Sequence, residues 1–310
     1  MSVFVLAPNE NWICDRFVEE WKSHSDYPVT NNILDAKCIW LLADWCWNQV
    51  PGHILQSKKV IASVHHIVPE KFDLKEHELF KIRDTIVDLY HVPCLRTKEQ
   101  IEKYTDKPIW VYPFWVNNDI WFPLDKDHKD NIREENNISK DHFLIGSFQR
   151  DTEGHDLISP KLEKGPDLFC DAVEQIADLQ KSKNREVSVI LAGWRRQYVM
   201  SRLESSGIDF HYFELPSFEK INKLYNILDL YIVAARYEGG PQAIVECAAC
   251  ETPIISTDVG LASMILHEDS IFQPGNVLSA VPNTRYAREK VSKYFMPNGF
   301  KPFIEMIEGM

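Results

Sequence analysis

The sequence of 310 residues predicts an α/β protein made of two Rossmann-like domains, each built on a parallel sheet. Three observations lead to this prediction. Short apolar runs alternate with helical patterns along the chain, the runs fall into two sets of five, and a highly charged stretch separates the sets. The composition agrees, because 45% hydrophobic and 26% charged residues are typical of a globular protein with a sizeable core.

The first set of apolar runs predicts the strands of an amino-terminal domain that covers residues 1–125. The expected strands are 2–7, 37–43, 59–64, 86–92 and 108–114. Eight of the nine tryptophans lie in this half of the chain, and we expect most of them to pack in a core. Aromatic platforms for a sugar or an apolar acceptor are the alternative role for these tryptophans.

The stretch LDKDHKDNIREENNISKD, residues 124–141, contains almost no apolar residue that is able to join a core. We therefore place the interdomain linker there, with room for a short exposed helix. The second set of runs predicts a domain at 140–283. Its expected strands are 142–148, 187–193, 208–213, 228–235 and 252–258. Two terminal helices follow, on either side of the breaker Pro297-Asn298-Gly299.

Acidic residues outnumber basic ones by 46 to 34, which gives a net charge of −12 and a pI near 5.4. An overall acidic field argues against nucleic acid or anionic lipid as a partner. No apolar run approaches the roughly 18 residues of a membrane span, and the amino terminus carries no basic leader. We therefore expect a cytoplasmic protein with no transmembrane span, and a solvated rather than membrane-surface helix within residues 70–84.

The seven cysteines are spread through apolar segments, as expected of buried thiols in a reducing compartment. Cys247 and Cys250 form a CxxC pattern. No second Cys or His pair at zinc spacing accompanies this pattern, so we favour packing over metal binding or redox chemistry.

The strongest functional signal lies in RYEGGPQAIVECAACETPIISTDVG, residues 236–260. Glu238 closely follows an expected strand, and ligands of open parallel sheets collect beyond the carboxyl ends of strands. Gly239 and Gly240 then approach a helix whose first turn suits Pro241. Because these glycines have no side chains, a phosphate is able to come close to the free N–H groups at the start of the helix.

Glu246 falls about a turn and a half into the same helix, too far along to act as a cap. A carboxylate there is able to accept two hydrogen bonds from a vicinal diol such as a ribose. Glu238 and Glu246 would then bracket a nucleotide sugar, one at each end. An isolated pair at this spacing is more often two solvated glutamates, but the glycines, the proline and the preceding strand favour a binding site here.

This segment looks like the nucleotide-sugar signature of the family 4 retaining glycosyltransferases. The resemblance is carried by Glu238-Gly239-Gly240-Pro241, Glu246, Ala248-Ala249-Cys250-Glu251-Thr252-Pro253 and Thr257-Asp258-Val259-Gly260. Gly240 stands where the family commonly has a phenylalanine. The resemblance implies the GT-B architecture, in which two Rossmann-like domains face each other across a deep cleft. It also implies that the carboxyl-terminal helix, at about 284–310, packs back towards the first domain.

A second segment similar to the family lies upstream. Its residues are Gly146-Ser147-Phe148-Gln149-Arg150 and Lys164-Gly165-Pro166-Asp167, which resemble the segment whose Arg and Lys bind the donor diphosphate. The resemblance therefore assigns the diphosphate to Arg150 and Lys164. Fixed cations suit this role, because a departing nucleoside diphosphate accumulates negative charge. A long polar insert separates the two residues, and Lys161 competes with Lys164.

The first half of the chain resembles the family more loosely. Residues 115–123 are similar to the segment that precedes the family's linker, and the strand that ends before His65 is similar to one that delivers a histidine to the acceptor side of the cleft. We expect His65 rather than His66 in this role, with a purely structural histidine as the alternative. The family often has a glycine-rich loop after its first strand, where this chain has Ala7-Pro8-Asn9-Glu10-Asn11-Trp12. Asn9 and Asn11 would supply amide contacts there or cap a helix that begins near Trp12.

These observations together predict a retaining, metal-independent hexosyltransferase that needs no cofactor. The donor would be a UDP- or GDP-linked sugar, and the acceptor a hydroxyl of a soluble glycan, glycoconjugate or small molecule rather than a nucleic acid. Glu238 and His65 are the expected catalytic residues, and Arg150, Lys164, Glu238, Gly239, Gly240 and Glu246 are the expected donor-binding residues. The alternative is a sugar-nucleotide-binding module without transferase activity, which the missing glycine-rich loop favours.

Overall fold

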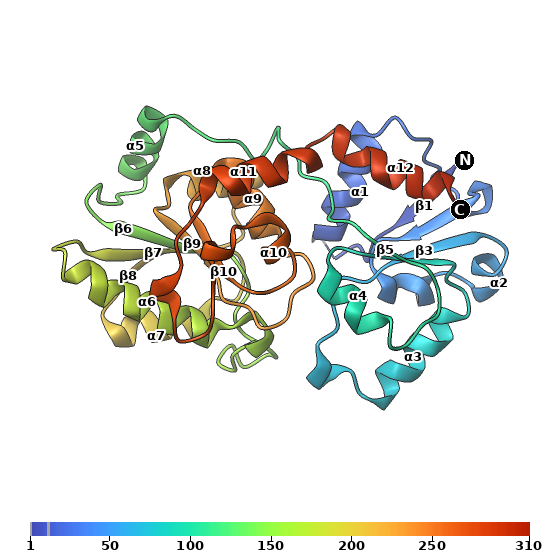
Figure 1. The fold of residues 1–310 in the computed structure, drawn as a ribbon, viewed down its shortest axis with the longest axis horizontal. Helices are drawn as coiled ribbons and strands as arrows, with labels where there is room; N and C mark the ends of the chain where they lie inside the picture. The colour runs from blue at the N-terminus through green and yellow to red at the C-terminus, as the bar shows by residue number, and fades with distance from the viewer. Residues whose placement is uncertain (1, 11–12) are drawn as a thin grey trace. The chain divides into compact units, whose positions relative to one another are not determined.

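The computed structural model describes residues 2–10 and 13–310 (Figure 1). The chain divides into two compact units. Unit 1 comprises Met1–Asn117 and Lys293–Met310, and unit 2 comprises Asn118–Ser292. Asn11 and Trp12, where we predicted the start of a helix, lie outside the described residues.

Unit 1 is built on a parallel sheet of five strands. They are β1 (Val3–Leu6), β2 (Cys38–Leu41), β3 (Lys59–Ser63), β4 (Leu89–Val92) and β5 (Ile109–Val111), and they lie side by side in chain order. All five coincide with predicted strands. The central strands are apolar and buried along almost their whole length, because helices cover both faces of the sheet.

The helices of unit 1 are α1 (Ile13–His24), α2 (Gly52–Leu55), α3 (Leu74–Asp84), α4 (Leu95–Ile101) and α12 (Lys301–Glu308). Figure 1 shows α1 and α12 on one face of the sheet and α3 and α4 on the other. Phe303 of α12 is fully buried in an aromatic cluster with Trp21, Trp40 and Trp115. Most of the first-half tryptophans that the structure describes are therefore core residues, whereas Trp45 is 40% exposed.

Unit 2 is built on a parallel sheet of six strands in the order β11-β10-β9-β6-β7-β8. They are β6 (Phe143–Ser147), β7 (Val187–Ala192), β8 (Asp209–Phe213), β9 (Leu230–Val233), β10 (Ile254–Thr257) and β11 (Ile271–Phe272). The chain starts at β6, adds two strands on one side, and returns to add three on the other. The switch point between β6 and β9 is where doubly wound sheets bind ligands, beyond the carboxyl ends of the strands.

The helices of unit 2 are α5 (Lys126–Glu135), α6 (Pro166–Lys181), α7 (Gln197–Ser206), α8 (Phe218–Ile227), α9 (Gln242–Cys250), α10 (Ala262–Ile265) and α11 (Thr284–Val291). Figure 1 shows α6 and α7 on one face of the sheet and α8 and α9 on the other. The α/β architecture with two parallel sheets, predicted from the sequence, is therefore confirmed. None of the helices that the structure describes is long and apolar enough to cross a membrane.

The charged stretch 124–141, predicted as the linker, belongs to unit 2 in the structure. It forms α5, where Ile132 is buried and Arg133 Nη2 donates hydrogen bonds to Asp229 Oδ2 (3.0 Å) and to the backbone oxygen of Ile227 (2.6 Å). The backbone N–H of Leu124 also donates to Asn226 Oδ1 (2.7 Å) on α8. These contacts are the physical reason why residues 124–141 belong to unit 2 and do not form a free linker.

All seven cysteines are buried and none forms a disulfide. Burial raises the pKa of both Cys247 and Cys250, so these thiols stay protonated. Cys250 Sγ lies 3.0 Å from Asn222 Oδ1, to which it donates a hydrogen bond. Both residues of the CxxC pattern are thus core residues of α9, as predicted.

Candidate active site

The loop after β9 is attached to the loop that precedes α6. Arg236 donates two hydrogen bonds to Asp167 in the first turn of α6, at 2.7 and 2.6 Å. The backbone N–H groups of Arg236 and Tyr237 both donate to the backbone oxygen of Glu163, at 2.8 and 3.1 Å. Because of these contacts, the residues just after β9 lie against the residues just before α6, at the switch point of the sheet.

Lys164 and Glu238 are in direct contact at this junction. Lys164 Nζ donates a hydrogen bond to Glu238 Oε1, and the two side chains are only 15% and 13% exposed. The residue predicted to bind the diphosphate therefore lies beside the residue predicted to hold the sugar. The competing Lys161 pairs with Glu163 instead, at 3.4 Å.

The polar insert that separates Arg150 from Lys164 is a closed loop. Its ends are joined by a hydrogen bond from Lys161 N to Asp151 O (2.8 Å), and an antiparallel bridge joins Thr152 to Pro160. Gln149 Nε2 also donates to the backbone oxygen of Lys164, at 2.8 Å. The two ends of the insert therefore lie side by side, so that Arg150 and Lys164 lie at the same edge of the sheet.

Arg150 is held at this edge by the insert and by an aromatic ring. Its Nε donates to the backbone oxygen of Thr152 (2.8 Å), and its guanidinium carbon lies 5.8 Å from the ring centroid of Trp194. Burial lowers the pKa of Lys161, and the positive charges of Lys164 and Arg150 lower it further, whereas Glu163 raises it. The three basic residues are therefore near neighbours, and two of them are also paired with carboxylates, Lys161 with Glu163 and Lys164 with Glu238.

Glu246 is buried in α9 and is held by a tyrosine. The hydroxyl of Tyr225, on α8, donates a hydrogen bond of 3.0 Å to Glu246 Oε2. Burial and the charge of Glu246 raise the pKa of Tyr225, so the hydroxyl keeps its proton and stays a donor. The sequence does not point to Tyr225, because nothing in its local pattern separates it from an ordinary core aromatic residue.

The loop Glu238–Pro241 rests on the loop after β10. Gly260 has a φ of +55°, and a Cβ there would lie 2.7 Å from the backbone oxygen of Gly239 and 2.7 Å from Pro241 Cδ. Only glycine fits both this conformation and this contact. Pro241 occupies the N-cap position of α9 without a side-chain capping hydrogen bond, and the helix begins at Gln242 and not at the proline.

His65 follows β3 in unit 1 and is held in one orientation. Its Nε2 lies 2.8 Å from the backbone oxygen of Leu42, so this nitrogen carries the proton. The ring stacks on Phe114 with a centroid distance of 5.7 Å, and Cys14 Sγ lies 3.5 Å from Nε2. Burial raises the pKa of Cys14 to about 12, so its thiol is no nucleophile at neutral pH. His66 is half-buried beside it.

In the loop after β1, two backbone N–H groups are hydrogen-bonded to a carboxylate of α1. The N–H groups of Asn9 and Glu10 donate to the two carboxylate oxygens of Asp15, both at 3.0 Å. Asn9 has a φ of +57°, a conformation that asparagine adopts more readily than most residues. Asn11, the other predicted amide contact, lies outside the described residues.

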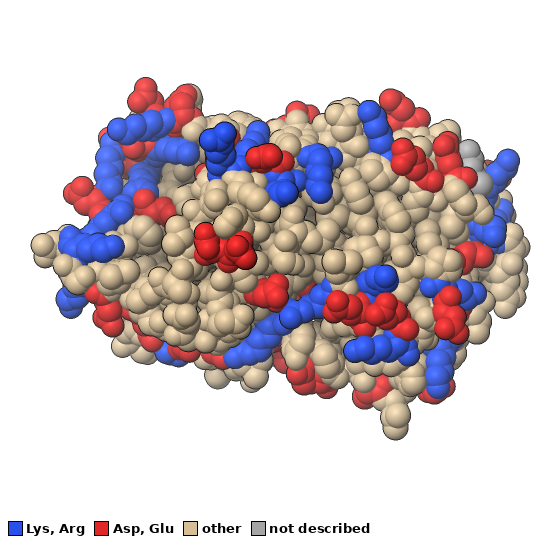
Figure 2. Space-filling model, viewed as in Figure 1, with Lys and Arg blue, Asp and Glu red and all other residues tan. Residues whose placement is uncertain are grey.

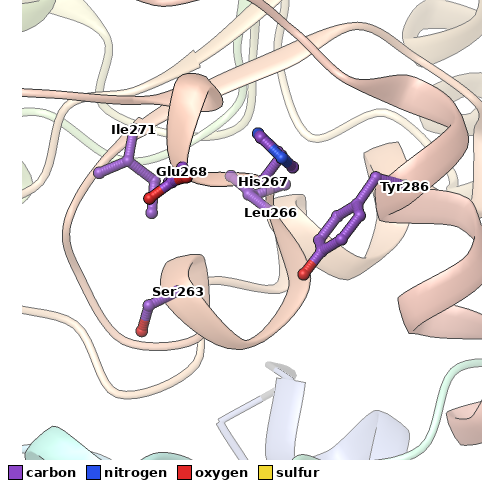
Figure 3. Close-up of a pocket in the computed structure, with 6 residues that line it drawn as sticks. All are labelled: Ser263, Leu266, His267, Glu268, Ile271 and Tyr286. Atoms are coloured by element: carbon purple, nitrogen blue, oxygen red, sulfur yellow. The ribbon is translucent and has the colours of Figure 1, made fainter.

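A pocket of about 280 Å³ lies elsewhere in unit 2 (Figure 3). It is lined by Ser263, Leu266, His267, Glu268, Ile271 and Tyr286. Figure 3 shows Ser263 of α10 on one side and Tyr286 of α11 on the other. His267 Nδ1 accepts from the backbone N–H of Asp269. None of the residues that line this pocket is a predicted site residue.

Basic and acidic side chains are interspersed on the face of the molecule drawn in Figure 2. Within residues 2–10 and 13–310, no group of three or more His, Cys, Asp or Glu side chains is arranged so that it would hold a metal ion.

The chain is similar to known proteins, in sequence over part of its length and in fold over nearly all of it. Residues 157–284 match the model of a family described as glycosyl transferases group 1. This segment includes Lys164, Glu238 and Glu246. The chain resembles the group 1 glycosyltransferases. The predicted resemblance is thereby confirmed at this level, while the narrower assignment to family 4 stays a prediction.

A curated relative is the alpha-galactosylglucosyldiacylglycerol synthase of Streptococcus pneumoniae, which is 24% identical over 165 residues. The match covers 50% of this chain and 39% of that relative, so the chain spans less than half of its length.

The solved structures extend the likeness to the whole chain. Alr3699/HepE of Anabaena, in complex with UDP-glucose, has a TM-score of 0.73 and 14% identity, over 100% of this chain and 99% of that one. Sucrose-phosphate synthase from Thermosynechococcus elongatus has a TM-score of 0.68 and 15% identity, over 95% of this chain and 77% of that one. At such identities the comparison shows the fold, which is the GT-B fold of glycosyltransferases.

Proposed function

We propose that this protein is a retaining hexosyltransferase that moves a sugar from a nucleoside-diphosphate sugar to an acceptor hydroxyl. The contact between Lys164 and Glu238 at the switch point of unit 2 carries this proposal. The contact supports the proposal because it sets a cation beside a carboxylate, and the phosphate and the sugar of one donor would need such a pair. The UDP-glucose bound by the Anabaena protein of the same fold supports a UDP-linked donor, and a GDP-linked donor is the alternative.

The donor-binding roles follow from the charges and the small residues at the edge of the sheet. Arg150 and Lys164 would pair with the diphosphate, and Gly239 and Gly240 would let it approach the start of α9. When the donor binds, a phosphate oxygen would replace Glu238 as the partner of Lys164. Glu238 would then be released to accept hydrogen bonds from the sugar hydroxyls.

Two fixed cations are able to stabilise the charge that develops on the departing diphosphate. We therefore propose a reaction that requires no metal ion or cofactor. Glu246, held by Tyr225, would bind the ribose diol. His65, with its proton on Nε2, would lie on the acceptor side.

For the acceptor we propose a hydroxyl of a soluble glycan, glycoconjugate or small molecule, and for the location the cytoplasm. On the face drawn in Figure 2, basic and acidic residues are interspersed, which supports this choice for that face because lipid-binding surfaces gather basic residues. Flotation with anionic vesicles tests it. Salt-sensitive co-flotation of the protein would contradict a soluble acceptor.

The donor is tested by thermal shift with UDP, GDP and their hexose conjugates. A ligand at a hundred times its Kd adds about 2.7 kcal/mol to the stability of the folded state, which raises the melting temperature measurably. We expect one nucleotide family to stabilise the protein. If none does, the assignment of the site is wrong.

The reaction is tested with the selected donor and a mixture of acceptors. We expect an α-configured donor to give an α-linked product, as read by NMR coupling constants, and the rate to be unchanged by EDTA. A β-linked product would exclude retention, and loss of activity in EDTA would exclude metal independence.

A further inference from the structure

A buried ion pair lies beneath the insert of unit 2. Arg196 Nε donates to Asp151 Oδ2 at 3.1 Å, and the two side chains are 0% and 2% exposed. The guanidinium also donates to the backbone oxygen of Ser147, to Ser147 Oγ (3.1 Å) and to the backbone oxygen of Ala192 (3.0 Å). One side chain therefore joins the carboxyl ends of β6 and β7 to the start of the insert.

Asp151 is the point at which the insert is closed. Its backbone oxygen accepts from Lys161 N at 2.8 Å, and its backbone N–H donates to Arg195 O at 3.1 Å. Asp151 directly follows Arg150, and Lys161 lies in the segment that leads to Lys164. The position of Asp151 consequently affects both basic residues assigned to the diphosphate.

This arrangement is costly for stability. Two charges removed from water recover their desolvation energy only with good hydrogen bonds, and apolar pairs of similar size are often at least as stable. Burial raises the pKa of Asp151, although Arg196 lowers it. Among the residues that the structure describes, Asp151 Oδ1 and Thr152 Oγ1 are buried without a hydrogen-bond partner. Stability alone therefore gives a poor account of this pair.

We propose that Arg196 and Asp151 are positioning residues, which hold the insert so that Arg150 and Lys164 meet the donor diphosphate. This inference rests on the proposed function, because it assumes a nucleoside diphosphate as ligand. Arg196 itself is fully buried and acts through Asp151. The planar guanidinium is essential to this role, since it reaches acceptors on β6, on β7 and on the insert at the same time.

The test compares Arg196→Lys and Asp151→Asn with a matched control, Arg133→Lys. Arg133 also joins a carboxylate and a backbone oxygen in unit 2, but through Asp229 at the amino end of β9. Calorimetry is done with UDP and with uridine, or with GDP and guanosine if the guanosine nucleotides are the ones that stabilise the protein. Arg196→Lys keeps the positive charge but removes the planar guanidinium with its several fixed donors.

We expect Arg196→Lys and Asp151→Asn each to raise the Kd of the diphosphate about tenfold, because misplaced cations bind phosphate poorly. The Kd of the nucleoside should stay unchanged. In the control, the ratio of the two Kd values should stay as in the wild type, even if the melting temperature falls. Hydrogen exchange should also become faster at the amides of Glu153 and Lys161, which close the insert.

Each other outcome has a distinct meaning. If the wild type binds no nucleoside diphosphate, the proposed function fails, and this inference with it. If the wild type binds and the variants keep its ratio of Kd values, the positioning role alone is overturned, whatever the exchange rates show. Equal changes in diphosphate and nucleoside affinity would also overturn it, because they indicate a general loss of structure in unit 2.

Discussion

At the level of single residues, two carboxylates of one segment have different environments. Glu246 is buried and receives a hydrogen bond from Tyr225, so its position is set before any ligand binds. Glu238 is paired with Lys164, and a bound donor would have to replace this contact by contacts of the two side chains with the donor. The first arrangement suits a constant part of the donor, such as the ribose, and the second suits the sugar that is transferred.

The substitution Glu246→Ala should therefore weaken binding of the free nucleoside diphosphate about ten- to a hundredfold, since charged hydrogen bonds contribute about 1.5–3 kcal/mol. Tyr225→Phe should have a smaller effect in the same direction. The matched comparison is Glu238→Ala, which should leave the free diphosphate bound at least as tightly, because Lys164 loses a competing partner. Calorimetry measures these affinities. An unchanged affinity of Glu246→Ala for the free nucleoside diphosphate would contradict the proposed binding of the ribose by Glu246.

A second prediction at this scale concerns His91, which is fully buried in unit 1. Its Nε2 donates to the backbone oxygen of Tyr112 (2.8 Å), and its Nδ1 lies 2.8 Å from Ser63 Oγ, which receives the N–H of Trp40. The neutral ring thus uses both nitrogens. Burial lowers its pKa to about 3, although the hydrogen bond to Tyr112 raises it, and the nearby His65 lowers it further.

Because an unfolded histidine has a pKa near 6.5, the unfolded chain binds one proton more than the folded chain between about pH 6.5 and the folded pKa of about 3. The free energy of unfolding should therefore fall with decreasing pH, by roughly 1 kcal/mol per pH unit from this residue. Denaturant unfolding of the wild type and of His91→Gln at pH 7 and pH 5 measures the contribution. The same loss of stability in both proteins would contradict it.

At the scale of elements, the start of α6 is the critical connection of unit 2. Gly165 precedes this helix with a φ of +62°, and a Cβ there would overlap the backbone oxygen of Ala234, just after β9. This close approach places Lys164 next to the loop that holds Glu238. The glycine of the KGPD segment is thus required by packing, independently of any ligand.

We predict that Gly165→Ala lowers the stability of unit 2 by about 3 kcal/mol or more, through backbone strain and overlap together. The control is Gly207→Ala, which has a similar φ of +66° but open space around the new methyl group. It should cost only about 1–2 kcal/mol, from the left-handed backbone alone. If denaturant unfolding shows the same loss of unfolding free energy in both variants, the backbone near Ala234 adjusts to the new methyl group with little loss of stability.

At the scale of the whole molecule, the strands were predictable and their side-chain contacts were not. Strands β1–β10 all coincide with predicted runs, because buried parallel strands are continuous apolar segments. β11 was missed, since two residues carry no pattern. The stretch 124–141 was interpreted as a linker because composition does not show that Arg133 is bonded to Asp229.

In the candidate site too, the sequence pattern was predictable and the contacts between side chains were not. The glycines and carboxylates of the segment after β9 were recognisable from their spacing. The contact between Lys164 and Glu238 depends on how the insert is closed, and Tyr225 and Arg196 look like any aromatic or basic residue in the sequence. The roles proposed for these residues rest on hydrogen bonds between elements far apart in the chain, which the sequence does not show.

The proposed function depends on unit 2 binding a nucleotide sugar and supporting its transfer. The most direct measurement is the release of nucleoside diphosphate from the stabilising nucleotide sugar, by wild type and by Glu238→Ala. We predict slow release by the wild type, faster release with acceptor, and a loss of about a hundredfold or more in Glu238→Ala with diphosphate binding retained. If the wild type binds the donor and releases no diphosphate over long incubation with acceptors, the protein is a binding module and the transferase account is wrong.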